Sequence, residues 1–334
     1  MIKLSGYQIL GKVYESSNSL VYRGVRKTDQ KPVILKMLKQ DYPSLEELTR
    51  YKQEYEITYQ LNEEGIVKAY SLESYQRTLV IILEDFQGKS LKFLMKNRPF
   101  NLEDFLNIAI KITESLAQIH NANIIHKDIN PSNIAINPET QQVKILDFGI
   151  STRLTRENPT LKNPNVLEGT LAYISPEQTG RMNRSLDYRT DFYSLGVTFY
   201  EMLTGCLPFE STEALELIHF HIAKQPTPPD QINPDIPKAI SDIVMKLLAK
   251  NAEDRYQSVW GIQSDLVICQ MQLEATGIIE DIIPGENDVY DKFQIPQKLY
   301  GREQEIQTIL STFEKVAAGQ LTLEESTDFS ILVS

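Results

Sequence analysis

Two short polar segments carry residue types that are suited to phosphoryl transfer. Asp128 and Asn133 lie in the segment HKDINPSN, and Asp147 follows Asn133 by fourteen residues, at the start of Asp-Phe-Gly. Such a reaction needs an acceptor hydroxyl held in line and magnesium ions that neutralise the phosphate charge. Asp128 can accept the proton of that hydroxyl, and Asn133 and Asp147 carry the hard oxygen ligands that Mg2+ prefers. Either segment alone also fits a loop with cap-forming side chains, whereas their order and spacing together predict a phosphotransfer site.

A lysine and a glutamate in the first third of the chain are the next candidates. Glu54 falls on the same face of a predicted helix as Ile57 and Leu61, so its carboxylate is expected to point toward the core. A buried carboxylate is costly unless a cation pairs with it, and Lys36 on a predicted strand is suited to that role. The alternative is an ordinary solvated glutamate on a charged helix.

The patterns around these residues change about one third of the way along the chain. Residues 7 to about 95 alternate short β-rich runs with one helix, which begins at Ser44 with a capping-box glutamate, Glu47, and ends near Leu61. From Asn101 onward apolar residues recur at three- and four-residue steps, as on one face of a helix. Further helices are predicted at about 189–204, 212–224 and 236–249. A β-rich part followed by a helical part predicts a two-lobed α+β fold.

These motifs resemble those of the protein kinase family, and the resemblance covers about residues 7–268. It implies the two-lobed protein kinase fold, with an N-lobe of about 7–86 and a C-lobe of about 87–268. It also implies an enzyme of signal transduction that binds ATP with Mg2+ and transfers the γ-phosphate to serine or threonine hydroxyls of proteins. By this resemblance the catalytic residues are Asp128, Lys36, Glu54, Asn133, Asp147 and Thr170, and the metal ligands are Asn133 and Asp147.

Later motifs resemble the same family. Thr170 matches the end of the activation segment in its serine/threonine form, in which the threonine bridges Asp128 and the residue two positions after it. Asp191 matches a buried aspartate that supports the catalytic loop, and Arg255 matches the arginine that pairs with Glu177. The resemblance implies structural roles for the end of the activation segment, for Asp191 and for Arg255.

The resemblance also implies a set of nucleotide-binding residues. They are Val13, Tyr14, Ser16, Ser19, Val21, Ile34, Lys36, Leu83, Glu84, Phe86 and Ala135. Leu83 is at the gatekeeper position, and the expected adenine contacts are the Glu84 carbonyl and the Phe86 amide. Ile34 above the adenine and Ala135 below it exchange the usual small and large residues, so the pocket is expected to keep a similar total volume.

Departures from the family favour an alternative function, that of a pseudokinase or regulatory module that controls a neighbouring domain. Tyr14, Ser16 and Ser19 stand where three glycines are usual, and glycine lets backbone amides approach phosphates closely. Asn130 replaces a lysine that contacts the γ-phosphate, and Lys127 replaces an arginine. The intact set of catalytic positions favours an active enzyme instead. A small-molecule kinase is a third alternative, which the complete activation segment disfavours.

The composition is that of an ordinary globular protein of 334 residues with a net charge of -11. This charge disfavours a nucleic-acid partner, because binding to phosphate backbones depends on lysine and arginine. No apolar run is long enough to predict a signal peptide or a membrane span. Cys206 and Cys269 show no metal-binding spacing, so we expect reduced thiols and a cytoplasmic location.

The last part of the chain differs from the rest. The helical pattern weakens after about Gln272, and residues 277–297 are rich in acidic residues, Pro and Gly, so a linker is predicted over 269–297. Beyond it, LYGREQEI followed by FSILVS resembles the beginning of an AAA/STAND-type NTPase, so 298–334 is expected to be the truncated start of such a domain. The whole chain therefore resembles the N-terminal part of a bacterial multidomain signalling kinase. Its expected partners are protein substrates and downstream NTPase or sensor domains or proteins.

Overall fold

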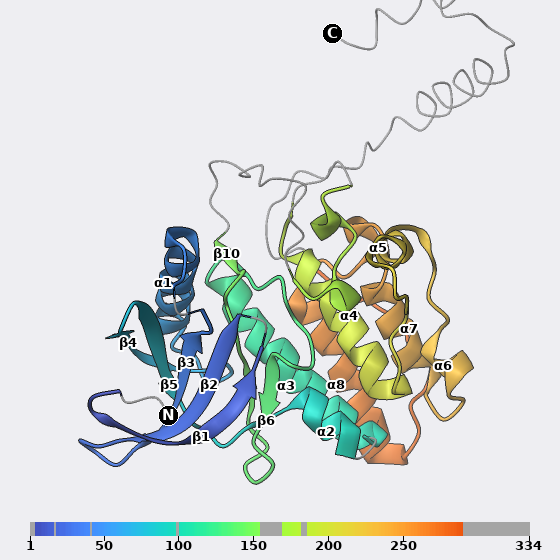
Figure 1. The fold of residues 1–334 in the computed structure, drawn as a ribbon. Coiled ribbons are helices and arrows are strands. Elements are labelled where there is room, and N and C mark those ends of the chain that lie inside the picture. The colour runs from blue at the N-terminus through green and yellow to red at the C-terminus, as the bar shows by residue number, and fades with distance from the viewer. Residues whose placement is uncertain are drawn as a thin grey trace, which may run out of the picture. The chain divides into compact units, whose positions relative to one another are not determined.

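The computed structural model describes residues 4–16, 18–40, 42–97, 100–153, 169–181 and 186–289. The contacts within the chain divide it into two units, 1–291 and 292–334. The second unit lies outside the described residues, and so does the predicted AAA/STAND-like segment. The first unit contains a β-sheet lobe and a helical lobe (Figure 1), so the prediction of a two-lobed α+β fold is confirmed.

The N-lobe is built on a five-stranded antiparallel sheet with the strand order β1-β2-β3-β5-β4. Its strands are β1 (Tyr7–Glu15), β2 (Ser19–Arg26), β3 (Pro32–Leu38), β4 (Ala69–Tyr75) and β5 (Thr78–Glu84). Helix α1 (Leu45–Gln60) packs on β4 and β5. It begins with the predicted capping box, in which Ser44 Oγ accepts from Glu47 N at 3.2 Å and Glu47 Oε2 accepts from Ser44 N at 2.7 Å.

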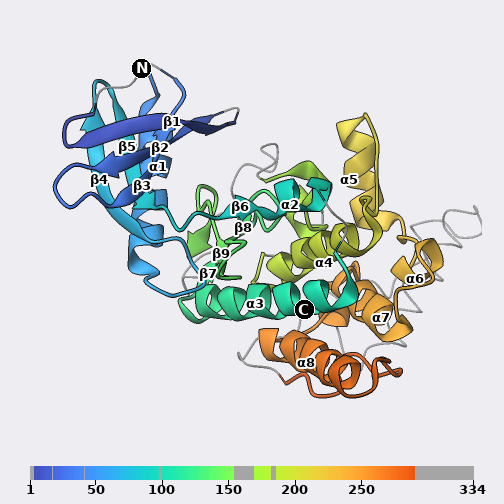
Figure 2. The same ribbon diagram turned by 90° about the horizontal axis from the view of Figure 1, so that it is seen from below.

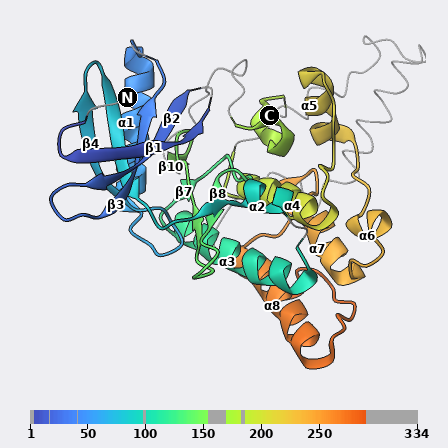
Figure 3. The same cartoon turned by 60° about the horizontal axis from the view of Figure 1, so that its bottom comes forward.

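The C-lobe consists mainly of helices (Figure 2). They are α2 (Leu91–Asn97), α3 (Leu102–Asn121), α4 (Arg189–Thr204), α5 (Ala214–Ala223), α6 (Pro229–Ile232), α7 (Lys238–Leu247) and α8 (Val259–Thr276). The helices predicted at 189–204, 212–224 and 236–249 correspond to α4, α5 and α7. Helix α3 lies along α8, as Figure 3 shows, and α4 packs against α7.

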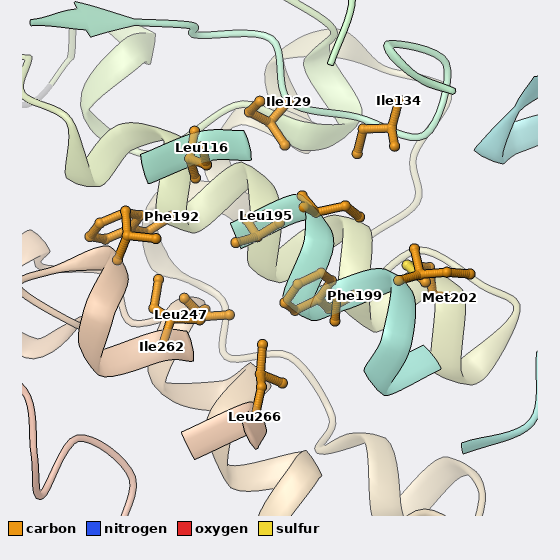
Figure 4. Close-up of a cluster of buried hydrophobic side chains, with 14 of the residues drawn as sticks. Leu116, Ile129, Ile134, Phe192, Leu195, Phe199, Met202, Leu247, Ile262 and Leu266 are labelled. Carbon is orange, nitrogen blue, oxygen red and sulfur yellow. The ribbon is translucent and has the colours of Figure 1, made fainter. Parts of the chain in front are cut away.

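The core of the C-lobe is built around α4. All of its residues from Arg189 to Met202 are buried, and Figure 4 shows Phe192 and Phe199 among the side chains of this core. Gly196 allows α4 to approach α7 closely, because a Cβ at this position would lie 2.7 Å from Leu247 Cβ. The result is a rigid platform under the loops that carry the candidate catalytic residues.

Very short strands hold those loops in register. Strands β6 (Lys89–Ser90), β8 (Ile134–Ile136) and β9 (Val143–Ile145) form one small sheet, and β7 (Ile124–Ile125) pairs with β10 (Thr152–Arg153). The segment HKDINPSN connects β7 to β8, and Asp147 follows the end of β9 by two residues. The segment HKDINPSN enters β8, and β8 pairs with β9, the strand that precedes Asp147, so the two polar segments lie in the same part of the lobe.

The structure differs from the sequence prediction after residue 268. Helix α8 runs to Thr276, so position 269, where a linker was predicted to begin, lies inside a helix, and Cys269 is fully buried. Ile279 is buried as well, and Asp288 Oδ2 accepts from the backbone N–H of Gln257 at 2.5 Å. Asp288, one of the acidic residues of the predicted linker, is thus a hydrogen-bond acceptor within the fold. The end of the predicted linker lies outside the described residues.

Both cysteines are free thiols, as the sequence predicted. Burial raises the pKa of Cys269 to about 12, and an inert structural thiol is the expected consequence. None of the helices in the described ranges combines the length and the apolar character needed to cross a bilayer.

Candidate active site

Lys36 joins three elements at the centre of the site. Its Nζ lies 2.6 Å from Oε1 of Glu54 on α1 and 2.9 Å from Oδ1 of Asp147 after β9. Lys36 and Glu54 are both buried, with exposed fractions of 8% and 6%. The pairing of Glu54 with Lys36 that the helix periodicity predicted is therefore present. It connects the N-lobe sheet, α1 and the Asp-Phe-Gly turn.

The charges of these three groups depend on one another. Burial lowers the pKa of Lys36, but the carboxylates of Asp147 and Glu54 outweigh burial and leave that pKa above its usual value. Burial raises the pKa of Glu54 to about 7, because the attraction of Lys36 offsets only part of it and Asp147 adds repulsion. Burial also opposes ionisation of Asp147, yet Lys36 holds the pKa of that carboxyl below its usual value. Lys36 and Asp147 are therefore charged at neutral pH, and Glu54 lies near its titration point.

The carboxylate of Asp128 is held from both sides. Its Oδ1 accepts from the backbone N–H of Thr170 at 3.0 Å, and its Oδ2 accepts from Asn133 Nδ2 at 2.8 Å. Asn133 Nδ2 also donates to the Asp128 carbonyl at 2.9 Å. The carboxylate thus has a fixed direction, and Asn133 uses its nitrogen rather than its oxygen to hold it.

Asn130 links the catalytic loop to Thr170. Its Nδ2 donates to the Asp128 carbonyl at 3.0 Å and to Thr170 Oγ1 at 3.4 Å, while its Oδ1 accepts from Ser132 N at 2.9 Å. The side chain is 2% exposed. Thr170 therefore bridges Asp128 and Asn130, as predicted, through its amide to the first and its hydroxyl to the second.

Asp191 supports the catalytic loop from inside the lobe. Its Oδ1 accepts from Lys127 N at 2.7 Å, and its Oδ2 lies 2.9 Å from His126 N and 2.8 Å from His120 Nε2. Lys127 and Asp147 have φ values of +70° and +64°. Residues other than glycine rarely adopt this left-handed backbone conformation unless the surrounding structure holds them in it. The predicted support is confirmed, and His120 also takes part in it.

The ion pair predicted between Arg255 and Glu177 is also present. The Nη1 and Nη2 atoms of Arg255 lie 2.7 Å and 2.8 Å from the two carboxylate oxygens of Glu177, in bidentate geometry. Thr190 Oγ1 donates to the same carboxylate at 2.9 Å. Arg255 thus joins the end of the activation segment to the segment before α8, and Thr190 joins it to the start of α4.

Residues 7–266 match the protein kinase domain family. The chain belongs to this family. One similar protein is a probable serine/threonine-protein kinase of Clostridium perfringens, 33% identical over 262 residues, which cover 78% of this chain and 38% of that protein. The serine/threonine-protein kinase PrkC of Bacillus subtilis is 30% identical over 267 residues, or 79% of this chain and 40% of that protein. Hybrid signal transduction histidine kinase G of Dictyostelium discoideum is 30% identical over 313 residues, which cover 67% of this chain and 9% of that protein. The chain spans less than half of each relative.

The loop between β1 and β2 contains the residues that the resemblance places where protein kinases have glycines. Val13 and Tyr14 are exposed at the end of β1, and Tyr14 is in register with Val21 of β2. The hydroxyls of Ser16 and Ser19 lie 2.9 Å apart. The structure brings these five expected nucleotide-binding residues into one hairpin, where the two serines contact each other.

The expected adenine pocket of the kinase domain is formed partly by neighbouring strands. Ile34 of β3 is in register with Leu83 of β5, and Lys36 of β3 is in register with Val21 of β2. Because side chains alternate along a strand, Ile34 and Lys36 share one face of β3. Ala135 is buried in β8 of the other lobe. That Ile34 and Ala135 enclose the adenine stays a prediction.

The hinge of the kinase domain contains contacts that the sequence analysis missed. The carboxylate of Glu84 accepts from Lys144 Nζ at 2.6 Å and from Lys68 N at 2.8 Å, and the Phe86 carbonyl accepts from Asn137 Nδ2 at 2.6 Å. Lys144 lies between two apolar residues of a buried strand, a signal that it needs an anionic partner. The adenine contacts of the Glu84 carbonyl and the Phe86 amide stay predictions.

Proposed function

We propose that this chain is a serine/threonine protein kinase, which transfers the γ-phosphate of ATP to hydroxyls of protein substrates in signal transduction. The observation that carries this proposal is the fixed carboxylate of Asp128, which accepts from Thr170 N at 3.0 Å and from Asn133 Nδ2 at 2.8 Å. A carboxylate with a set direction can align an acceptor hydroxyl and take its proton. The family and the names of its serine/threonine kinase relatives support the same activity.

In this proposal Lys36 binds the α- and β-phosphates of ATP. The ion pair with Glu54 keeps its ammonium group in place, and its raised pKa keeps it charged at neutral pH. A preorganised positive charge stabilises the phosphates without any reorganisation at the moment of reaction. Thr170 acts through Asp128 and Asn130, so it positions the base rather than taking part in the transfer.

Asn133 and Asp147 fit a Mg2+ ion. Asn133 directs its nitrogen to Asp128, and within the described residues no donor occupies its oxygen. Asp147 is ionised, because Lys36 lowers the pKa of its carboxyl, and its side chain is 43% exposed. Mg2+ commonly takes one or two protein oxygens and completes its shell with phosphates and water. When bound, the ion would neutralise charge on the phosphates.

We also infer that the kinase domain, about 7–268, is followed by an NTPase region of AAA/STAND type that begins at about 298. The resemblance of LYGREQEI and FSILVS to such a region supports this inference, as does the much greater length of the relatives. The partners of the whole protein would be protein substrates and domains that sense or respond to a signal. The location of the protein would be cytoplasmic.

One specific pair of observations favours the alternative, a regulatory nucleotide-binding module. Asn130 is buried and directs its amide to Asp128 and Thr170, so it supplies no cation toward a γ-phosphate. The serines of the β1–β2 turn replace the glycines that usually approach phosphates. A module of this kind would bind nucleotide and change conformation without turnover.

A radiolabelled ATP assay on the purified chain, with casein and the chain itself as acceptors, separates the two functions. Asp128→Asn should lower turnover at least about 100-fold and leave ATP binding nearly unchanged, because it removes the base but no nucleotide contact. Asp242→Asn, an exposed change on α7, is the matched control and should keep the wild-type rate. Equal turnover in Asp128→Asn and wild type would contradict the proposed kinase activity. A wild-type protein that binds ATP but shows no turnover would favour the regulatory module.

A further inference from the structure

The turn between β1 and β2 uses the hydroxyl of Ser16 as a hydrogen-bond acceptor. Ser16 Oγ accepts from the backbone N–H of Ser19 at 2.9 Å and from that of Asn18 at 3.3 Å. The backbone N–H of Ser16 donates to the Ser19 carbonyl at 2.9 Å. Three amides of this turn are therefore satisfied within the turn itself.

Neighbouring contacts support this closed arrangement. Asn18 accepts from Lys39 N at 2.9 Å through its carbonyl, which ties the turn to the end of β3. Glu15, the residue before Ser16, lies 2.6 Å from Lys12 Nζ and 2.7 Å from Lys39 Nζ. A single carboxylate beside the turn thus pairs with both lysines.

The three described residues of this turn need no left-handed backbone conformation. Ser16, Asn18 and Ser19 are not among the described residues with a positive φ, so these three positions do not depend on glycine. The serines are therefore not merely tolerated where glycines are usual. They stabilise a turn whose N–H groups point to an internal acceptor.

An N–H group has one hydrogen, so it cannot donate fully to a hydroxyl and to a phosphate at the same time. In a loop that covers phosphates, the backbone amides are the groups that approach the phosphate oxygens. We propose that the hydroxyl of Ser16 competes with the phosphates of a bound nucleotide for the amides of Asn18 and Ser19. Binding of the phosphates then requires that these two amides exchange the Ser16 hydroxyl for phosphate oxygens. This inference rests on the proposed function, because it assumes that nucleotide binds under the loop.

The competition has a signature that depends on the phosphates of the ligand. Adenosine has no phosphates, so it does not compete for the amides of Asn18 and Ser19. Its affinity should therefore not depend on the Ser16 hydroxyl. ATP offers anionic acceptors, which form stronger hydrogen bonds than a hydroxyl but must first displace it. Removing the hydroxyl should therefore improve the binding of ATP and leave that of adenosine unchanged.

The experiment measures the dissociation constants of Mg-ATP and of adenosine by calorimetry for wild type, Ser16→Ala and Ser16→Gly. We expect the ratio of adenosine to ATP dissociation constants to rise about three- to tenfold in Ser16→Ala, the scale of one or two exchanged hydrogen bonds. Ser16→Gly removes the same hydroxyl with a different backbone preference and should change the ratio in the same direction. The control is Ser211→Ala, which removes a similar hydroxyl cap, 3.0 Å from Glu213 N, in the C-lobe.

The outcomes separate this inference from the proposed function. A ratio that is unchanged or lower in both Ser16 variants, with wild-type melting temperatures, would overturn the competition and leave the kinase proposal intact. A wild-type protein that binds neither ATP nor adenosine would overturn both. A ratio that rises equally in Ser211→Ala would also overturn the competition, because the effect would not belong to the turn.

Discussion

Lys144 of β9 and Glu84 at the end of β5 form a buried ion pair between the two lobes, with Nζ 2.6 Å from Oε1. Their side chains are 6% and 18% exposed. Glu84 Oε1 also accepts from Lys68 N at 2.8 Å, and Lys144 Nζ donates to the Ile66 carbonyl at 3.1 Å. One pair of side chains thus joins the hinge, the segment between α1 and β4, and the strand that leads to Asp147.

Lys144→Met should lower the free energy of unfolding by about 3 kcal/mol, because it leaves the carboxylate of Glu84 buried without its cation. Adding Glu84→Gln should recover part of this loss, since the double variant contains no unpaired charge. Urea denaturation of the two single variants and the double variant measures both effects. Lys238→Met is the control, because Lys238 pairs with Asp242 in an exposed position and should contribute less than about 0.5 kcal/mol. Equal losses in the two lysine variants would contradict a stabilising role for the buried pair.

The ionisation of Glu54 should make the nucleotide-free protein less stable as the pH rises. The pKa of Glu54 is raised to about 7 in the folded protein, against an ordinary value of 4.5. The stabilising contribution of the bound proton is therefore complete below pH 4.5 and is lost as the pH rises through 7. The slope of one proton is about 1.4 kcal/mol per pH unit.

Glu54→Gln cannot ionise, so it isolates this effect. Between pH 5 and pH 8 its free energy of unfolding should rise relative to that of the wild type. The measurement is urea denaturation of both proteins at pH 5, 6, 7 and 8 without nucleotide. Parallel pH profiles would show that Glu54 does not titrate in this window.

Contacts that follow from the burial of a charge were predictable from the sequence. Helix periodicity placed Glu54 on the core face of α1, and the cost of a buried carboxylate required a cation, which is Lys36 at 2.6 Å. The bridge from Thr170 to Asp128 and the pair of Arg255 with Glu177 were predictable only through the family resemblance, since no local pattern connects residues so distant in the sequence.

Contacts that depend on how loops pack were not predictable. Nothing in the periodicity of β9 indicates that Lys144 meets Glu84, because the two residues belong to different lobes. Asp288 looked like a linker residue, but its carboxylate accepts from the backbone at the start of α8. For Ser16 the sequence identified the substitution, whereas the direction of its hydroxyl depends on the backbone of the turn.

His221 should make the fold sensitive to acid. It is fully buried on α5, and its Nδ1 lies 3.0 Å from the Tyr193 hydroxyl. Burial, assisted by the positive charge of Lys250, lowers its pKa to about 4, from an ordinary value of 6.5. As the pH falls below 6.5, His221 of the unfolded chain binds a proton, whereas His221 of the folded protein stays neutral until about pH 4. The contribution of His221 to the free energy of unfolding should therefore fall in this window by about 1.4 kcal/mol per pH unit.

The variant that tests this is His221→Asn, with His219→Asn as the control on the exposed side of the same helix. Urea denaturation at pH 7.5, 6, 5 and 4.5 isolates the contribution of His221 as a difference between variants. As the pH falls, the free energy of unfolding of His221→Asn should rise relative to that of the wild type, whereas that of His219→Asn should follow the wild type. An equal rise in His219→Asn would assign the acid sensitivity to another group.

Arg255 should not be replaceable by lysine. It is 1% exposed, and besides the two contacts with Glu177 it donates to backbone carbonyls of three residues. These carbonyls belong to Ala249, Arg189 and Lys250, at 2.8, 2.9 and 3.2 Å. A lysine has three donors on a single nitrogen and cannot reproduce the planar fork that satisfies two carboxylate oxygens.

Arg255→Lys should therefore lower the free energy of unfolding by about 3 kcal/mol, since it leaves buried acceptors without donors. Arg50→Lys is the matched control, because Arg50 pairs with Glu46 on the exposed side of α1, and its effect should stay within about 0.5 kcal/mol. The two variants keep the charge of the wild type, so a difference between their urea midpoints reports geometry and burial rather than charge. If both midpoints equalled that of the wild type, a single ammonium group would suffice to hold Glu177, and the fork geometry of Arg255 would have no energetic role.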